Sequence, residues 1–251
     1  MARAAVQRRL TWQLAEVVDA VDEAPRVRTL VLAVPDWPGH QAGQHVDVRL
    51  TAEDGYQAQR SYSIASSPED RGRIALTIER LDDGEVSPYL VDEARIGDQV
   101  ELRGPIGGYF VWDVDMADPL LLVAGGSGIS PLMAMLRHRA ARSSMIPARL
   151  LYSARSYEDV IYRAELDRLA AAGDGLETFL TLTRSRPPSW TGFGRRVDRE
   201  MLAEVAWRPE RRQLAFICGP TPFVEAAAGH LVELGHEAAR VKTERFGPTG
   251  G

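Results

Sequence analysis

The first part of the chain combines short hydrophobic runs with turn residues. From Thr11 to about Val111, apolar and β-branched side chains alternate with polar ones at a period of two, as in strands with one buried face. The clearest runs are Val27–Leu32, His45–Leu50, Arg73–Ile78 and Asp98–Leu102. Their spacing predicts an antiparallel barrel or sandwich. One stretch inside this region, Val86–Glu93, predicts a short helix.

After Pro119 the pattern changes to an alternation of apolar strands and helices. A strand over Leu120–Ala124 leads through a glycine-rich turn into a helix over Pro131–Arg142. The further strands and helices expected are, in chain order, Arg149–Ser153, Asp159–Ala171, Glu177–Thr183, Asp198–Ala206, Gln213–Cys218 and Pro222–Leu234. This alternation is typical of βαβ units with a parallel sheet. We expect the boundary near Asp115–Asp118, with domains at 1–115 and 116–251.

The composition of the chain limits the kinds of chemical site that it can form. The chain has 251 residues, of which 45% are hydrophobic, enough for large cores without metals or disulfides. Its single cysteine, Cys218, excludes an intramolecular disulfide and argues against zinc–thiolate sites and iron–sulfur clusters. The five histidines are scattered, and the chain has neither an HExxH motif nor a nucleophile elbow. We therefore expect no metal site and no hydrolase triad.

Charge bears on the partners. A net charge of −5 argues against nucleic acid. Residues 1–115 carry 12 Arg against 20 acidic residues (−8), whereas residues 116–251 carry 17 Arg and one Lys against 15 acidic residues (+3). No apolar run reaches the ~18–20 residues of a membrane span, and Met1–Arg9 lacks the apolar core of a signal peptide. We expect a cytoplasmic protein without a membrane or nucleic-acid partner.

A glycine-rich turn opens the second domain. The segment Ala124–Pro131 reads AGGSGISP and lies between a predicted strand and a predicted helix. Glycines allow a backbone to approach a pyrophosphate closely, and the unpaired amides at a helix N-terminus favour an anion. A glycine-rich turn without a ligand is the alternative for this stretch taken alone.

Two motifs in the first domain carry further candidate residues. In Arg60–Pro68 (RSYSIASSP), an Arg can pair with phosphates, a Tyr can offer a flat face to a ring system and a Ser can bond a ring heteroatom. In Gly84–Leu90 (GEVSPYL), a capped helix N-terminus can present amides to an anion. Taken singly, these are an exposed strand with a Ser-rich turn and a capped helix.

The last motifs lie near the C-terminus. The segment Phe216–Phe223 (FICGPTPF) places Cys218 at a strand end, where open α/β sheets bind ligands. A lone buried cysteine is more often a small hydrophobic residue of the core. The chain ends in Glu244–Gly251 (ERFGPTGG), whose aromatic residue can tether the terminus or stack on a ring.

The order of these motifs, from about Thr11 to the end, resembles the ferredoxin–NADP reductase superfamily of flavoproteins, and most of all the reductase components of bacterial oxygenase systems. The resemblance implies a two-domain protein, an antiparallel Greek-key β-barrel that binds a flavin followed by a parallel-sheet α/β domain that binds NAD(P). It also implies FAD as the flavin, with FMN as the alternative.

The resemblance assigns the flavin to residues of the barrel. Arg60 is expected on the flavin phosphates, Tyr62 against the isoalloxazine, and Ser63 near the reactive N5, with Ile64 following. The amides of Val86 and Ser87 are expected on the flavin pyrophosphate.

The resemblance assigns the nicotinamide nucleotide to the second domain. The residues expected to hold it are Gly125, Gly126, Gly128 and Ile129 on the pyrophosphate, and Cys218, Gly219 and Pro220 beside the nicotinamide. Phe246 is expected to pack near the flavin with Glu244 beside it, although five residues follow Phe246 and leave its stacking role open. The implied catalytic residues are Ser63, Cys218 as an orienting contact, and Glu244. Arg155 can meet a 2′-phosphate, which favours NADPH slightly over NADH.

These expectations combine into one main hypothesis. The protein transfers hydride from NAD(P)H to bound FAD and then passes single electrons to a separate acceptor, a ferredoxin or an oxygenase component, because one cysteine cannot hold a cluster. The basic second domain suits an acidic redox partner. The alternatives are an NAD(P)H:flavin reductase that releases its flavin and a flavin- and nucleotide-binding electron-transfer subunit without turnover of its own.

Overall fold

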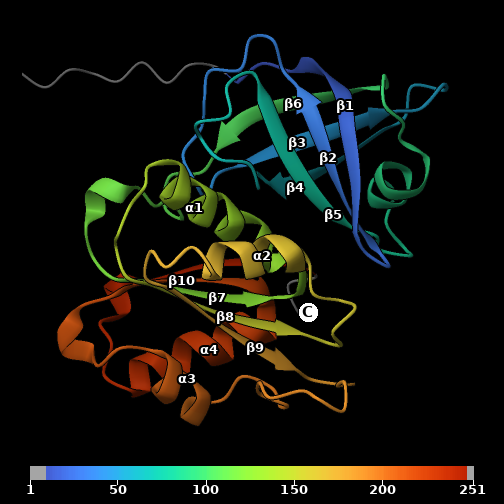
Figure 1. Cartoon of the computed structure of the whole chain (residues 1–251). Coiled ribbons are helices and arrows are strands. Elements are labelled where there is room, and N and C mark those ends of the chain that lie inside the picture. Colours follow the sequence, from blue (N-terminus) through green and yellow to red (C-terminus); the bar gives the residue numbers. More distant parts are fainter. Residues whose placement is uncertain (1–9, 248–251) are drawn as a thin grey trace, which may run out of the picture.

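The computed structural model describes residues 10–247, which form two halves that each contain one β-sheet (Figure 1). The expectation about Met1–Arg9 and most of the segment after Phe246 lie outside the described residues. The two sheets are joined through the segment 107–119, and the boundary at Asp115–Asp118, which overlaps a 3-10 turn over Val114–Met116, remains a prediction.

Six antiparallel strands form the first half. They are β1 (Gln13–Ala24), β2 (Val27–Ala33), β3 (His45–Thr51), β4 (Gln57–Ser63), β5 (Arg73–Glu79) and β6 (Gln99–Ile106). Their order in the sheet is β4-β3-β6-β1-β2-β5, and an isolated bridge between Ile64 and Leu76 links the two outer strands. The side chains that alternate inward, such as Leu30, Val46 and Val48, form one apolar core. The predicted antiparallel Greek-key barrel is confirmed.

The predicted short helix of the barrel is a single helical turn of five residues. A π-helical segment, η1, covers Tyr89–Glu93. Before it, the amide of Leu81 donates to Ser87 Oγ at 3.1 Å and the amide of Gly84 donates to the Leu81 carbonyl at 3.1 Å. These bonds hold the loop that leads into η1.

The second half is a parallel sheet. Its strands are β7 (Leu120–Gly125), β8 (Ala148–Ala154), β9 (Leu176–Leu182), β10 (Leu214–Pro220) and β11 (Val241–Phe246), in the order β11-β10-β7-β8-β9. The hydrophobic pattern did not predict β11, because Lys242, Glu244 and Arg245 give it a polar sequence. It forms because β10 offers a complete parallel ladder from Ala215 to Pro220.

Four helices cover this sheet. They are α1 (Ile129–Ala141), α2 (Arg163–Ala170), α3 (Arg199–Val205) and α4 (Thr221–Glu233). The first two lie between the sheet and the barrel, and the last two cover the opposite face (Figure 1). The start of α2 is later than the predicted Asp159, because Tyr162 adopts a left-handed backbone with φ of 59°.

The two halves pack through a shared apolar core. Ala42, Ala65 and Trp112 of the barrel side belong to the same buried cluster as Leu132 and Met135 of α1. Close packing of this kind leaves little room for independent movement of the halves.

A polar clamp lies beside this core. The guanidinium of Arg137 on α1 donates to the Ala65 carbonyl at 2.8 Å and bonds both carboxylate oxygens of Glu165 on α2. The segment that follows Ser63 on β4 is thereby held to the second half.

The strand order decides where a ligand can bind. The chain leaves β7 toward β8 on one side, and returns later to β10 on the other side of β7. Crevices of α/β sheets open at such a reversal, at the carboxyl ends of the strands. The glycine-rich turn after β7 and Cys218 on β10 both lie at this point.

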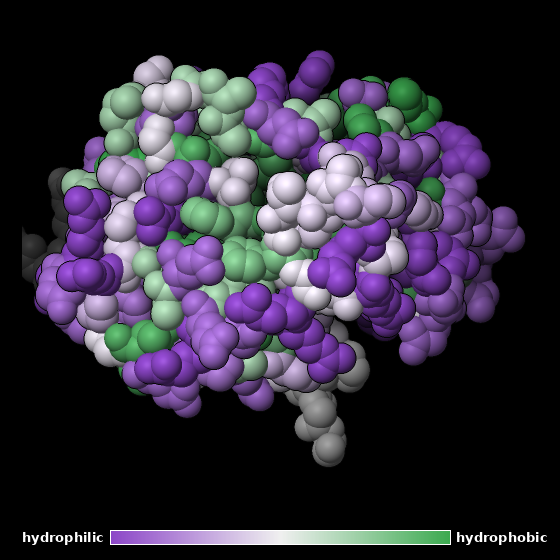
Figure 2. All heavy atoms as spheres, turned by 60° about the horizontal axis from the view of Figure 1, so that its bottom comes forward, coloured by the Kyte–Doolittle hydropathy of each residue, from purple (hydrophilic) through white to green (hydrophobic). Residues whose placement is uncertain are grey.

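The surface turned forward in Figure 2 is mainly hydrophilic, with hydrophobic residues in smaller patches between polar ones. Within residues 10–247, no helix has the length and apolar composition needed to cross a membrane.

Candidate functional site

A cavity of about 630 Å³ opens at the carboxyl ends of β7, β8 and β10. Its walls include Gly125, Gly126, Ser127, Arg155, Thr183, Arg184, Arg196, Pro220, Phe223 and Phe246. Residues of the barrel half, Arg26 and Glu79 among them, complete it. The cavity therefore brings together the predicted nucleotide residues Gly125, Gly126, Arg155 and Pro220, and Phe246, which was predicted to lie near the flavin.

The three glycines of the turn after β7 are required for different physical reasons. Gly126 has a φ of +56°, and a Cβ there would project into open space, 4.0 Å from Glu79 Oε2. A Cβ on Gly125 would meet the ring of Phe223 at 2.9 Å. A Cβ on Gly128 would overlap the backbone of Cys218. One glycine thus shapes the cavity, and the other two allow close packing around it.

The turn leads directly into the N-terminus of α1, where Ile129 is the first helical residue. No side chain caps this terminus. The first amides of a helix lack internal partners, so an anion in the cavity would find donors and a favourable dipole there. The side chain of Ile129 is fully buried, and its amide donates to the carbonyls of Gly126 and Ser127. The donors for such a contact are therefore the amides just before it, in the 3-10 turn Gly126–Gly128.

The predicted flavin residues lie on β4 and at its end. The guanidinium of Arg60 is half exposed, and its hydrogen bonds within residues 10–247 go to Glu85, at 3.4 Å, and to the carbonyl of its neighbour Gln59, at 2.6 Å. The hydroxyl of Tyr62 forms no hydrogen bond with a residue in 10–247, and burial raises its pKa. Both side chains project from the same face of β4, since they are two residues apart. A guanidinium and an aromatic ring on one face match the needs of a flavin with phosphates.

Three other predicted flavin residues are more buried. Ile64 and Val86 are fully buried in the barrel core and can offer only backbone groups. The hydroxyl of Ser87 accepts the amide of Leu81 and keeps its O–H to donate. Amides at the start of a helical turn have no internal partner, so those of Val86 and Ser87 remain candidates for an anion.

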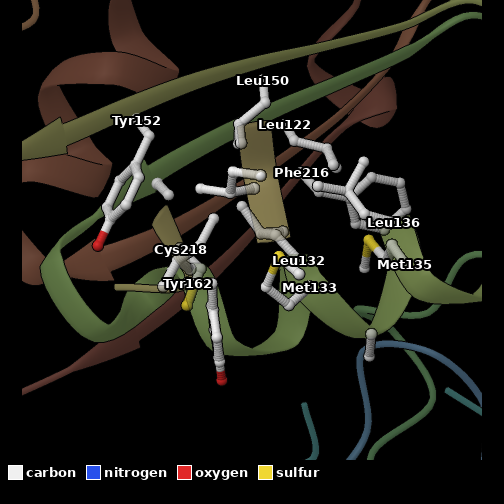
Figure 3. Close-up of a cluster of buried hydrophobic side chains, with 14 of the residues drawn as sticks. Leu122, Leu132, Met133, Met135, Leu136, Leu150, Tyr152, Tyr162, Phe216 and Cys218 are labelled. Atoms are coloured by element: carbon white, nitrogen blue, oxygen red, sulfur yellow. The ribbon is translucent and has the colours of Figure 1, made fainter. Parts of the chain in front are cut away.

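Cys218 lies in the core below α1. Its side chain is 2% exposed and belongs to the cluster that contains Met133 and Tyr162 (Figure 3). Burial, and then the charge of Glu244, raise the pKa of the thiol well above its ordinary value. The group is therefore a neutral thiol, which is unsuited to nucleophilic attack.

Glu244 lies beside Cys218 on the neighbouring strand. The β10–β11 register pairs the two residues, and the Glu244 side chain is 25% exposed. Its Oε2 is buried and has no hydrogen-bond partner within the described part of the chain. Burial raises the pKa of this carboxyl to about 7. Glu244 can therefore hold or release a proton near neutral pH.

His45 links the two halves at this point, and no motif singles it out in the sequence. Its Nδ1 is 3.8 Å from Glu244 Oε1, and burial lowers its pKa. On the barrel side it pairs with Ser63 in the β3–β4 hairpin. The three predicted catalytic residues, Ser63, Glu244 and Cys218, are thus connected through His45. Strand pairing joins Ser63 to His45 and Glu244 to Cys218, and the 3.8 Å contact joins His45 to Glu244. Counting outward from Asp54, the centre of the β3–β4 turn, pairs 45 with 63, but nothing local indicates that β11 approaches.

Thr221 is a second residue that the sequence motifs did not indicate. It is the first residue of α4, directly after Gly219 and Pro220. Its Oγ1 is buried without a hydrogen-bond partner in the described region. An orphaned hydroxyl at the end of β10 is available to a polar ligand group.

Phe246 ends β11 opposite Pro220 and forms part of the cavity wall. It is half-buried and packs against the core of the second half. The predicted contact of Phe246 with a flavin remains a prediction.

Comparisons with known proteins agree with this geometry. A family model described as an oxidoreductase FAD-binding domain matches residues 15–111, and one described as an oxidoreductase NAD-binding domain matches residues 122–229. NADH-cytochrome b5 reductase 1 of Aspergillus terreus is 32% identical over 212 residues, which cover 82% of this chain and 71% of that protein. The chain belongs to the family of FAD- and NAD-binding oxidoreductases that includes the ferredoxin reductases.

Other members of this oxidoreductase family are similar over nearly the whole chain. The glycine betaine monooxygenase reductase subunit of Pseudomonas aeruginosa is 32% identical over 247 residues, which cover 95% of this chain. The chain spans 66% of that relative's length, just under two thirds. The flavohem-like FAD/NAD-binding domain of nitric oxide dioxygenase from Vibrio cholerae has a TM-score of 0.83 and 25% identity, covering 94% of this chain and 98% of that one.

The residues of this oxidoreductase fit the two groups that its family binds. For NAD(P), the fit rests on the open space beside Gly126 and the uncapped start of α1. For FAD, it rests on the exposed guanidinium of Arg60 and the ring of Tyr62 with its unpartnered hydroxyl. Within residues 10–247, no cluster of three His, Cys, Asp or Glu side chains is arranged to hold a metal ion.

Proposed function

We propose that this oxidoreductase is an FAD-dependent NAD(P)H reductase that delivers single electrons to a separate acceptor, a ferredoxin or an oxygenase component. The observation that carries the proposal is the series from Ser63 through His45 to Glu244 and Cys218, which joins the flavin side to the nucleotide side. Bound FAD supplies the step from two-electron to one-electron chemistry. The chain itself has to position the two nucleotides.

In this proposal the barrel holds the flavin. The guanidinium of Arg60 and the amides of Val86 and Ser87 bind its phosphates, and the ring of Tyr62 packs against its ring system. To bind a phosphate, Arg60 gives up its ion pair with Glu85. Both side chains of that ion pair are half exposed, so the ion pair is weak. Ser63 ends β4 and presents its hydroxyl at the domain interface.

The second half holds the nucleotide. The turn from Gly125 to Gly128 and the start of α1 bind its pyrophosphate, and Cys218 and Thr221 flank its reacting end. The thiol of Cys218 is 2% exposed, so Cys218 acts on the ring by holding the end of β10 in place. Glu244 holds or moves a proton at its carboxyl, with His45 at 3.8 Å as the adjacent group.

The proposed reaction is tested by mixing purified, flavin-loaded protein with NADPH or NADH without oxygen and recording the visible flavin absorbance. We expect the absorbance to bleach within a turnover time and to return when an oxidised ferredoxin is added. A flavin that stays oxidised with both nucleotides would contradict the proposal and favour a binding subunit without turnover. Separation of the flavin during gel filtration would favour a reductase that releases it.

We further propose that the donor is NADPH. Arg155, Arg184 and Arg196 line the cavity beyond β8 and β9, and no carboxylate of residues 10–247 lies within 4.0 Å of their guanidinium groups. Unpaired guanidinium groups are suited to a 2′-phosphate.

The double variant Arg184→Ala/Arg196→Ala is expected to lower kcat/KM for NADPH about 100-fold and to change that for NADH less than threefold, at about tenfold per charge-assisted bond. Steady-state kinetics with both nucleotides measure the ratio. Arg208→Ala, an exposed arginine outside the cavity, is the matched control. Equal losses of kcat/KM for NADPH and NADH would show that these arginines do not determine the preference for NADPH.

A cytoplasmic location is part of the proposal, since the proposed donor is a cytoplasmic nucleotide. Cell fractionation with an antibody to the chain tests it. Recovery in the membrane fraction would contradict it.

A further inference from the structure

Glu79 belongs to the barrel half but lines the nucleotide cavity. It is the last residue of β5, and its Oε2 accepts a hydrogen bond from Ser127 Oγ at 2.7 Å. The point where a Cβ of Gly126 would lie is 4.0 Å from the same oxygen. A carboxylate of one half thus lies directly against the glycine-rich turn of the other half.

This carboxylate is not neutralised by the protein. No Arg, Lys or His nitrogen of residues 10–247 lies within 4.0 Å of Glu79, and its Oε1 accepts no hydrogen bond from that part of the chain. Arg26, the arginine of the barrel half in the cavity wall, is paired with Asp82 at 2.9 Å and donates to the Arg80 carbonyl at 3.0 Å. Glu79 therefore retains one free acceptor oxygen.

The other carboxylate in the cavity wall differs in this respect. Asp159 Oδ2 already accepts the amide of Ser156 at 3.0 Å and its hydroxyl at 2.8 Å. Those bonds hold the loop after β8. Asp159 is thus tied to that loop, whereas Glu79 lies directly against the glycine-rich turn.

The chemistry of the ligand follows from the charges. The pyrophosphate is held by the amides of the turn, and the guanidinium groups that attract a 2′-phosphate lie beyond β8 and β9. A carboxylate repels phosphate, so the partners left for Glu79 are the uncharged hydroxyl groups next to the pyrophosphate. A carboxylate next to a dinucleotide turn is suited to accept from ribose hydroxyls. Glu79 belongs to the barrel, the half that holds the flavin in the proposed function, and the nicotinamide has to reach that flavin. The ribose that Glu79 meets is therefore the one next to the nicotinamide, whereas the arginines lie beyond β8 and β9.

We propose that Glu79 is a positioning residue that accepts a hydrogen bond from the ribose on the nicotinamide side of the bound nucleotide. The inference rests on the proposed function and deepens it. The barrel then contributes to the nucleotide site as well as to the flavin site, so a nucleotide is held correctly only when both halves are docked. Ser127 orients the carboxylate by its hydrogen bond.

The test compares ADP-ribose with ADP, which lacks the additional ribose, by isothermal titration calorimetry on oxidised, flavin-loaded protein. We expect Glu79→Ala to raise the Kd for ADP-ribose about tenfold and to leave the Kd for ADP within twofold, since a bond to a charged acceptor is worth about that factor. Glu79→Gln, which keeps an acceptor for Ser127, should show a smaller loss of the same sign. Glu53→Ala, an exposed glutamate in the β3–β4 turn, is the matched control.

Three results would overturn the inference or its basis. Tighter binding of both ligands by Glu79→Ala would identify a repulsive group and contradict the inference. Equal weakening of both would identify a purely structural role through Ser127, and would contradict it as well. If the wild-type protein bound neither ligand and its flavin also stayed oxidised with NADPH, the proposed function itself would be contradicted.

Discussion

Replacement of Gly128 by alanine is expected to lower the melting temperature by about 10 °C and to remove nucleotide binding. A Cβ at this position would overlap the carbonyl oxygen of Cys218 and lie 2.5 Å from its carbonyl carbon and 2.7 Å from the Gly219 nitrogen. All three atoms belong to the backbone of β10, which cannot move without breaking its ladders to β7 and β11. Overpacking of this kind costs about 3 kcal/mol, and the turn is displaced from the cavity.

Thermal unfolding and titration with ADP measure the two effects. Gly229→Ala is the matched control, because a Cβ there meets nothing within 4 Å and α4 gains about 1 kcal/mol of helix propensity. Its melting temperature should equal or exceed that of the wild type. A Gly128→Ala protein with unchanged stability and ADP binding would show that the turn can move away from β10.

Glu244→Gln is expected to slow the reoxidation of reduced flavin by the acceptor about 100-fold, because that step releases a proton that the carboxylate can accept; this is the lower range for loss of a general base. The pKa of this carboxyl is raised from 4.5 to about 7 by burial, so the ionised fraction rises as the pH rises through 7. The wild-type rate is therefore expected to rise as the pH rises through 7, and the variant rate to be flat there. Anaerobic stopped-flow measurements from pH 5.5 to 8.5 test this.

The same carboxyl makes stability depend on pH. Because its pKa is raised on folding, it contributes stability that is fully present below pH 4.5 and is lost as the pH rises through 7. The loss is on the order of 3 kcal/mol. Glu244→Gln should remove it, so the variant gains stability relative to the wild type at pH 8 but not at pH 5.

Chemical denaturation at the two pH values provides this measurement. Glu225→Gln, an exposed glutamate on α4, is the matched control and should follow the wild type at both. If the wild type and Glu244→Gln showed parallel stability curves and parallel pH–rate profiles, the buried proton would have no role in folding or in the reaction.

The sequence pattern predicted most of the fold because its signals are local. Period-two runs such as Val27–Leu32 form strands with one buried face, and the change of pattern after Pro119 marks a parallel sheet. The same local reasoning missed β11, whose polar residues are held by hydrogen bonds to β10. It also began α2 too early, since the left-handed conformation of Tyr162 has no sequence signal at that residue.

The sequence also predicted only part of the candidate site. Short motifs named residues whose neighbours along the chain matter, such as Gly126 in its turn and Arg60 beside Tyr62. His45 and Glu79 carry no motif, because each acts on a group far away in the sequence: His45 lies 3.8 Å from Glu244, and Glu79 bonds Ser127.

Cys218 shows most clearly which properties the sequence determines and which only the tertiary structure decides. The sequence places the only cysteine at a strand end and excludes disulfides, and it carries the motifs of two nucleotide sites. Only the packed structure decides that this thiol is 2% exposed and uncharged, and that an adjacent carboxyl on β11 shares its buried environment. Burial and electrostatics depend on which surfaces meet after folding, and for Cys218 the decisive surfaces come from α1 and β11, which are distant along the chain.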